Sequence, residues 1–118
     1  MSSDRWKNLE IWKLGDEIAF QIYVLTKDFP KEEIYGITGQ IRRSALSIPT
    51  NIVEGYSRKG DKQLAYFLNV SLGSLAETKY LLYFSHRLGY INSDSHNQLH
   101  DQMELLGKKL WKFYDTVR

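Results

Sequence analysis

The residues best suited to chemistry in this 118-residue chain are its three histidines and the carboxylates near them. His96, His100 and Glu104 fall at positions i, i+4 and i+8 of a helical segment, and two imidazoles one turn apart can chelate a metal ion. No HExxH pattern accompanies them, and a carboxylate two turns from the first histidine reaches such an ion poorly. Because two ligands do not close a site, we interpret this face as a hydrated polar surface and expect no metal.

Catalytic signatures are missing from the sequence. The chain has no cysteine, which excludes thiol catalysis and cysteine-ligated zinc or iron–sulfur clusters. It has no nucleophile elbow, no phosphate-binding loop and no dinucleotide glycine fingerprint, and Gly36 and Gly39 form a lone GxxG. We therefore predict that the protein is not an enzyme and uses no cofactor.

Basic residues gather in two stretches of a chain whose formal net charge is only +2. Residues 40–62 hold five basic against two acidic residues, and residues 105–118 hold four against one, so each stretch carries a local +3. Such runs are usually solvated faces, but a ring of identical subunits would multiply their field and could bind phosphates. The candidate phosphate contacts are Arg42, Arg43, Arg58, Lys59 and Lys62.

A polar stripe runs beside the apolar face of the segment 31–55, at steps of three and four residues. It consists of Gln40, Arg43 or Ser44, Ser47, Asn51 and Glu54. In the structural interpretation, Ser47 and Asn51 satisfy backbone groups that Pro49 frees, and Glu54 pairs with an arginine or caps a neighbouring helix. In the alternative, this edge contacts a ligand or another subunit.

Glycines mark two further positions. Gly55 suits the C-terminal end of the helix that precedes it. Gly73, followed by Ser74, lies in the middle of a helical segment, where glycine costs about 1 kcal/mol relative to alanine. We therefore expect another backbone to approach closely there. The carboxylate of Glu77, one turn later, could pair with Arg42 or Arg43 across the bundle.

Four segments with helical periodicity must position these residues, and no segment alternates as a strand would. We expect helices over about 9–27, 31–55, 61–88 and 93–117, in a single domain spanning 1–118. Pro49 should bend the second helix without ending it, because the apolar period continues through Ile52. Short connections make neighbours antiparallel, so the predicted fold is all-α, an up-down-up-down four-helix bundle.

The first segment carries a second apolar set away from its core stripe, and the third segment adds three tyrosines. The set consists of Trp12, Ala19, Phe20 and Tyr23, and the tyrosines are Tyr66, Tyr80 and Tyr83. These rings either cap the ends of a small aromatic-rich bundle or lie between copies of the chain. We favour self-association, because closed symmetric assemblies are common among soluble proteins.

Composition and termini set the class of protein. A hydrophobic content of 42% over this length supplies one core without disulfides or structural metal. Residues 1–10 are too charged for a secretory signal, and the longest uncharged stretch, 63–76, is too polar for a membrane span. We expect a cytoplasmic protein with no membrane partner.

Two motifs carry a family resemblance. The run QIRRSALSIPTNIVEG at 40–55 closely resembles the signature of the small proteins first recognised as products of intervening sequences in bacterial 23S rRNA genes. The stretch LGSLAE at 72–77 resembles the second signature of that family, and the lead-in at 9–30 is also similar, so the likeness covers nearly the whole chain.

The resemblance implies a cytoplasmic bacterial four-helix bundle that assembles as a ring-shaped homopentamer and has no established enzymatic activity. The family is similar in architecture to the accessory subunits of diversity-generating retroelements, which bind a reverse transcriptase and nucleic acid. Two functional hypotheses follow. The protein binds RNA or DNA as a non-catalytic oligomer, or it is a scaffold or accessory subunit whose partner is another protein.

Overall fold

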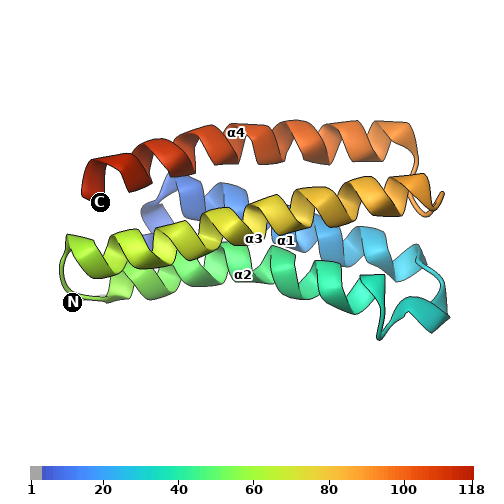
Figure 1. Ribbon diagram of the computed structural model, residues 1–118, viewed down its shortest axis with the longest axis horizontal. Coiled ribbons are helices and arrows are strands. Elements are labelled where there is room, and N and C mark those ends of the chain that lie inside the picture. Colours follow the sequence, from blue (N-terminus) through green and yellow to red (C-terminus); the bar gives the residue numbers. More distant parts are fainter. Residues whose placement is uncertain (1–3) are drawn as a thin grey trace.

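Periodic apolar residues organise four long α-helices, as the sequence predicts. The computed structural model describes residues 4–118, and this part of the chain is helical with no strand (Figure 1). The α-helices are α1 (Glu10–Leu25), α2 (Ile37–Ser57), α3 (Asp61–Arg87) and α4 (Ser93–Val117). Three short 3₁₀ turns flank them: η1 (Arg5–Asn8), η2 (Thr26–Asp28) and η3 (Lys31–Glu33). The predicted fold class is confirmed.

The helices pack side by side in the order α1, α2, α3, α4, with α4 closing against α1. The α2–α3 pair makes the most extensive contact. In Figure 1, α3 lies in front of α1, so these two helices occupy diagonal corners of the bundle. The long axis measures 43 Å.

The core is built from one apolar stripe of each helix. Ile18, Ile22, Ile48, Leu68 and Leu106 are fully buried, and each lies in the stripe that its three- and four-residue spacing predicts. The apolar side chains that meet on the bundle axis therefore hold the four helices together.

The second helix begins later than its sequence suggests. Residues 31–33 form the 3₁₀ turn η3, and α2 starts at Ile37 rather than at residue 31. The Glu33 carboxylate, which the sequence places in a first helical turn, instead accepts the N–H of Ile37 at 3.4 Å and the hydroxyl of Tyr90 at 2.8 Å. A contact 57 residues away in the sequence therefore fixes this connection.

Gly55 does not end α2, because the helix continues to Ser57. A Cβ atom at Gly55 would lie 2.9 Å from Cβ of Phe67 and 3.3 Å from the backbone oxygen of Leu64. Gly55 is a packing residue that allows α3 to approach α2 closely. Pro49 lies within the same uninterrupted helix, as predicted.

Tyr90, just after α3, ties the loop at its end to the α1–α2 connection. Its ring centroid lies 5.2 Å from that of Phe29, and its hydroxyl donates to Glu33. The hydrogen bond to the Glu33 carboxylate, with smaller contributions from desolvation and from the charge of that carboxylate, raises the pKa of Tyr90.

We expect this contact to stabilise the fold until alkaline pH removes it. Because the pKa of Tyr90 is raised in the folded state, its contribution is present below the unfolded tyrosine value of about 10 and disappears as the pH rises through the folded value. Tyr90→Phe should therefore lower Tm at about pH 8. The decrease should become smaller toward about pH 11, because tyrosine side chains lose their protons in this range. Thermal unfolding followed by circular dichroism measures both. Tyr35→Phe is the control, because that ring is 95% exposed; a pH-independent difference for Tyr90→Phe would contradict the assignment.

Candidate functional site

Three segments that are distant in the sequence meet at one end of the bundle. The antiparallel topology places the end of α2, the start of α3 and the end of α4 together, and η1 contacts the same part of α2 (Figure 1). We call the residues 4–13, 54–62 and 108–118 the basic end. They contain ten basic and five acidic residues, a local +5, whereas the rest of the chain carries −3.

Ion pairs neutralise part of this charge. Lys7 pairs with Asp4, Arg58 with Glu54, Lys109 with Glu10 and Arg118 with Asp115, at 2.6 to 3.7 Å. All four pairs are solvent-exposed, so each adds little stability. Six basic residues of this end form no ion pair within residues 4–118: Arg5, Lys13, Lys59, Lys62, Lys108 and Lys112.

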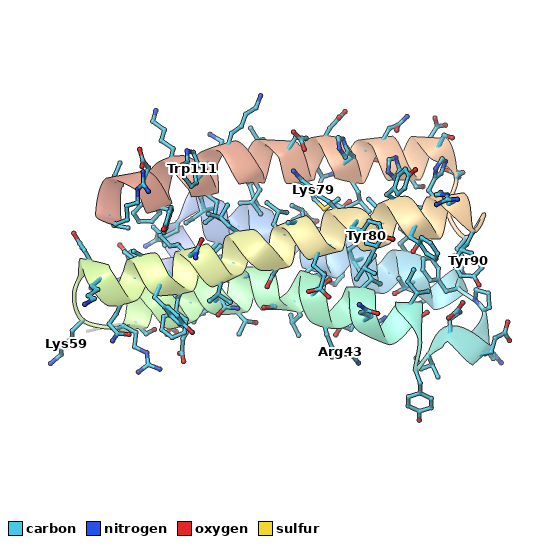
Figure 2. The ribbon with its side chains drawn as sticks, in the orientation of Figure 1. Arg43, Lys59, Lys79, Tyr80, Tyr90 and Trp111 are labelled. Carbon is cyan, nitrogen blue, oxygen red and sulfur yellow. The ribbon has the colours of Figure 1, made fainter. Side chains whose placement is uncertain are left out.

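The five predicted phosphate contacts do not form one surface. Lys59 and Lys62 are exposed at the basic end, and Arg58 is there too, paired with Glu54 and lying over the Phe67 ring at 5.3 Å. Figure 2 shows Lys59 projecting from this end, whereas Arg43 projects from the outer side of α2 farther along the bundle.

Arg42 points elsewhere. Its Nε donates to Thr26 Oγ1 at 2.8 Å, and its guanidinium lies 5.0 Å from the centroid of the Tyr23 ring. The residue therefore contacts the C-terminal end of α1, at the other end of the bundle. Sequence reasoning left Arg5, Lys13, Lys108 and Lys112 out of the candidate set, although the predicted topology was enough to bring their segments beside Lys59.

The polar stripe of α2 joins this helix to α3. Ser47 Oγ lies 2.8 Å from Ser74 Oγ, and Asn51 Nδ2 donates to both the oxygen and Oγ of Ser47. Deeper in the same interface, Thr78 Oγ1 donates to Ser44 Oγ, and Ser71 Oγ donates to the oxygen of Ile48. The signature residues Ser47, Asn51 and Ser74 therefore have hydrogen-bond partners within the bundle, whereas Gln40 is exposed to solvent.

The expected neighbours of Gly73 and Glu77 are missing from the described part of the chain. A Cβ at Gly73 would meet no atom within 4 Å, so no backbone of residues 4–118 approaches it. Glu77 is exposed and pairs with neither Arg42 nor Arg43 within the same residues. Neither predicted pair of Glu77 is therefore present within these residues, and the Arg42 guanidinium is directed toward α1 instead.

Apolar side chains are exposed on two opposite sides of the bundle. The α1 face consists of Phe20, Tyr23 and Val24 with Leu46 of α2, and Phe20 is 65% exposed. The α3 face consists of Tyr66, Val70, Gly73 and Tyr80, at helical spacing; Figure 2 shows Tyr80 on the front of α3. Trp12, the third predicted interface residue, is half-buried against the core and packs edge-on against Trp6 at 4.9 Å.

The histidines stack rather than converge. The ring centroids of His86 and His96 are 4.9 Å apart, and those of His96 and His100 are 5.8 Å apart. Lys79 Nζ lies 2.6 Å from Glu104 Oε1, and this hydrogen bond is the main reason that the pKa of Glu104 is lowered. Across residues 4–118, no group of three or more histidine, aspartate or glutamate side chains is arranged to hold a metal ion.

The fold and the charge distribution define a class of protein: a small antiparallel four-helix bundle with one basic end and two exposed apolar faces. The family model described as 23S rRNA-intervening sequence protein matches residues 7–112. The chain belongs to this family, and the resemblance of the two motifs is confirmed.

A solved structure supports this assignment. The chain is similar to a protein of unknown function from the S23 ribosomal protein family of Bacteroides thetaiotaomicron VPI-5482, with 25% sequence identity and a TM-score of 0.82. The similarity covers 89% of this chain and 95% of that one. No curated protein matches the chain. None of the helices in residues 4–118 is long and apolar enough to cross a membrane.

Proposed function

We propose that this protein is a non-catalytic cytoplasmic homo-oligomer that binds RNA through its basic end. The observation that carries this proposal is the convergence of three separate segments into one end with a local +5 in a chain of net +2. Six of its basic side chains form no ion pair within the described residues and can neutralise phosphates.

Self-association is supported by the two apolar faces. The α1 face and the α3 face differ in composition and lie on diagonally opposed helices. A two-fold dimer needs one self-complementary face, whereas a head-to-tail ring needs two unlike faces on each subunit. We propose that the α1 face of one subunit contacts the α3 face of the next, in the homopentameric ring that the family resemblance implies.

A ring would concentrate the charge. Cyclic symmetry places equivalent ends of all subunits on the same side, so the basic ends would form one positive rim. Five copies multiply a local charge that is modest in one chain.

The test is an RNA-binding titration at several salt concentrations, with the mass of the protein determined by light scattering. We expect affinity for a structured RNA hairpin to fall by about 10³-fold between 50 and 200 mM salt, as six or more phosphate contacts predict. Lys59→Glu should weaken binding about tenfold or more at fixed salt. Arg87→Glu, a matched charge change on an exposed side chain at the opposite end, should not.

The second candidate function is a scaffold or accessory subunit for a protein partner. Arg58, one of the five predicted phosphate contacts, is already paired with Glu54 within the chain, which favours this alternative. An oligomer that ignores RNA at every salt concentration would support the scaffold. A monomer that ignores RNA would contradict both functions.

A further inference from the structure

A pocket of about 440 Å³ lies at the end of the bundle opposite the basic end, where η2, η3 and the first turn of α2 meet. Three basic residues line it: Lys27, Lys31 and Arg42. No aspartate or glutamate is among its lining residues. The charged side chains that line the pocket are therefore all positive, whereas the residues outside the basic end together carry a net −3.

Thr38 gives the pocket an unpaired hydroxyl. The residue is 3% exposed, and its Oγ1 is the one buried side-chain polar atom within residues 4–118 that has no hydrogen-bond partner. An unsatisfied buried hydroxyl costs about 1–3 kcal/mol. The Oγ1 atom itself has almost no accessible surface, but Thr38 lines the pocket, so a rotation of this side chain would let a bound ligand supply the missing partner.

Arg42 is held in place but keeps free donors. Its Nε donates to Thr26 Oγ1 at 2.8 Å, its Nη2 donates to the Tyr23 oxygen at 3.4 Å, and the Tyr23 ring supports the guanidinium. These contacts use two of the five guanidinium N–H groups, so about three N–H groups remain for a ligand. The side chain is thus positioned in advance, which lowers the entropy that binding would cost.

The start of α2 adds a favourable dipole. Thr38 lies in the first turn of this 21-residue helix, where backbone N–H groups carry partial positive charge. Within the described residues, the N–H groups of Thr38 and Gly39 donate to no backbone or side-chain oxygen, whereas that of Ile37 reaches Glu33. A helix start of this kind favours anions.

We propose that this pocket binds a phosphate monoester. A phosphate dianion offers enough charge and acceptor oxygens for two lysines, a guanidinium fork and a hydroxyl. Phe29 and Ile34 line the same pocket and would contact an apolar or ring-shaped body attached to the phosphate. A free nucleoside 5′-monophosphate and the 5′-phosphate end of an RNA chain share this chemistry.

Calorimetric titration of the full-length protein with adenosine 5′-monophosphate tests the proposal, with adenosine as the ligand that lacks phosphate. We expect binding in the millimolar range or tighter, and binding by adenosine at least about tenfold weaker, since the phosphate makes the charged contacts. Thr38→Val keeps the shape of the side chain, removes only the hydroxyl, and should weaken nucleotide binding about five- to tenfold. Thr50→Val is the matched control, because Thr50 lies on the exposed side of the same helix.

Stability separates a ligand-binding hydroxyl from a structural one. Because Thr38 Oγ1 has no partner in the free protein, Thr38→Val should leave Tm unchanged or raise it while it weakens binding. Lys31→Ala, which removes an exposed side chain and leaves the core intact, should weaken binding as well.

Two RNA oligonucleotides of one sequence, one with a 5′-phosphate and one with a 5′-hydroxyl, distinguish the two sources of the phosphate. If the protein prefers the phosphorylated RNA and Thr38→Val abolishes this preference, the pocket binds RNA ends. If the nucleotide binds but the protein shows no such preference between the two RNAs, the pocket binds free nucleotides.

The proposal is overturned if the nucleotide does not bind, or if Thr38→Val and Lys31→Ala bind it as the wild type does. It is also overturned if Thr38→Val lowers Tm, because the hydroxyl would then have a structural role. Loss of nucleotide binding in Lys59→Glu, with the two pocket variants unaffected, would place the phosphate at the basic end instead.

Discussion

Replacing Gly55 with valine is expected to lower the free energy of unfolding by about 3 kcal/mol, since the added atoms overpack the α2–α3 contact. A Cβ at this position would lie 2.9 Å from Cβ of Phe67 and 3.3 Å from the Leu64 backbone oxygen. Neither group is the free end of a flexible side chain, so the two helices must move apart. For a domain of this size, the expected fall in Tm is about 12 °C.

Gly107→Ala is the matched control for this prediction. Gly107 also lies within a helix, but a Cβ there would meet its nearest neighbour, Cδ2 of Leu75, at an ordinary 3.4 Å. The substitution should stabilise α4 by roughly 0.5–1 kcal/mol through helix propensity. Urea denaturation of the three proteins measures the differences. Equal stabilities for Gly55→Val and the wild type would show that α2 and α3 can separate without cost at Gly55.

The sequence was sufficient for the fold because the apolar residues repeat at helical spacing. Pro49 is informative here: the apolar period continues across it, and α2 does too. The glycines were harder to interpret. Gly55 suits the end of a helix and also a close helix contact, and only the position of Phe67 in space decides between these roles.

The connection between α1 and α2 was mispredicted for a similar reason. Glu33 suits the first turn of a helix, but Tyr90 binds its carboxylate and η3 forms instead of an early start to α2. The orphaned hydroxyl of Thr38 could not be predicted either, because burial without a partner depends on every neighbouring element.

The candidate site was predicted in parts. Arg42 and Arg43 are adjacent in the sequence, and periodicity alone does not say which of them turns toward α1. The two local +3 stretches were recognised separately, yet residues 58–62 and 108–118 meet only because the bundle alternates direction three times. The predicted topology already contained this information, so the basic end is a finding that sequence reasoning could have reached.

Gly73 provides the sharpest test of the proposed ring. The sequence predicts a close backbone approach at this glycine, and no atom of residues 4–118 lies within 4 Å of the position that a Cβ would take there. A mid-helix glycine costs about 1 kcal/mol relative to alanine, and under the ring proposal a neighbouring subunit supplies the close approach that offsets it. We therefore expect Gly73→Leu to keep or raise the stability of the folded subunit and to block assembly.

Light scattering measures this effect directly. The wild type should have about five times the 13.9 kDa mass of the chain, and Gly73→Leu should be monomeric. Asp101→Leu, which places the same side chain at an exposed position of α4, is the control and should assemble normally. If Gly73→Leu assembles to the wild-type mass, the α3 face is not part of the subunit interface.

Mixing variants tests the direction of the contact. Phe20→Glu should block the α1 face and leave the α3 face intact, whereas Gly73→Leu does the reverse, so each variant alone should be monomeric. In a head-to-tail ring the two variants retain one compatible pair of faces, and their mixture should form a dimer of about twice the chain mass and nothing larger. If each face instead paired with its own copy, each variant alone would dimerise through its intact face. The mass of the mixture therefore decides whether the two faces of this bundle bind each other.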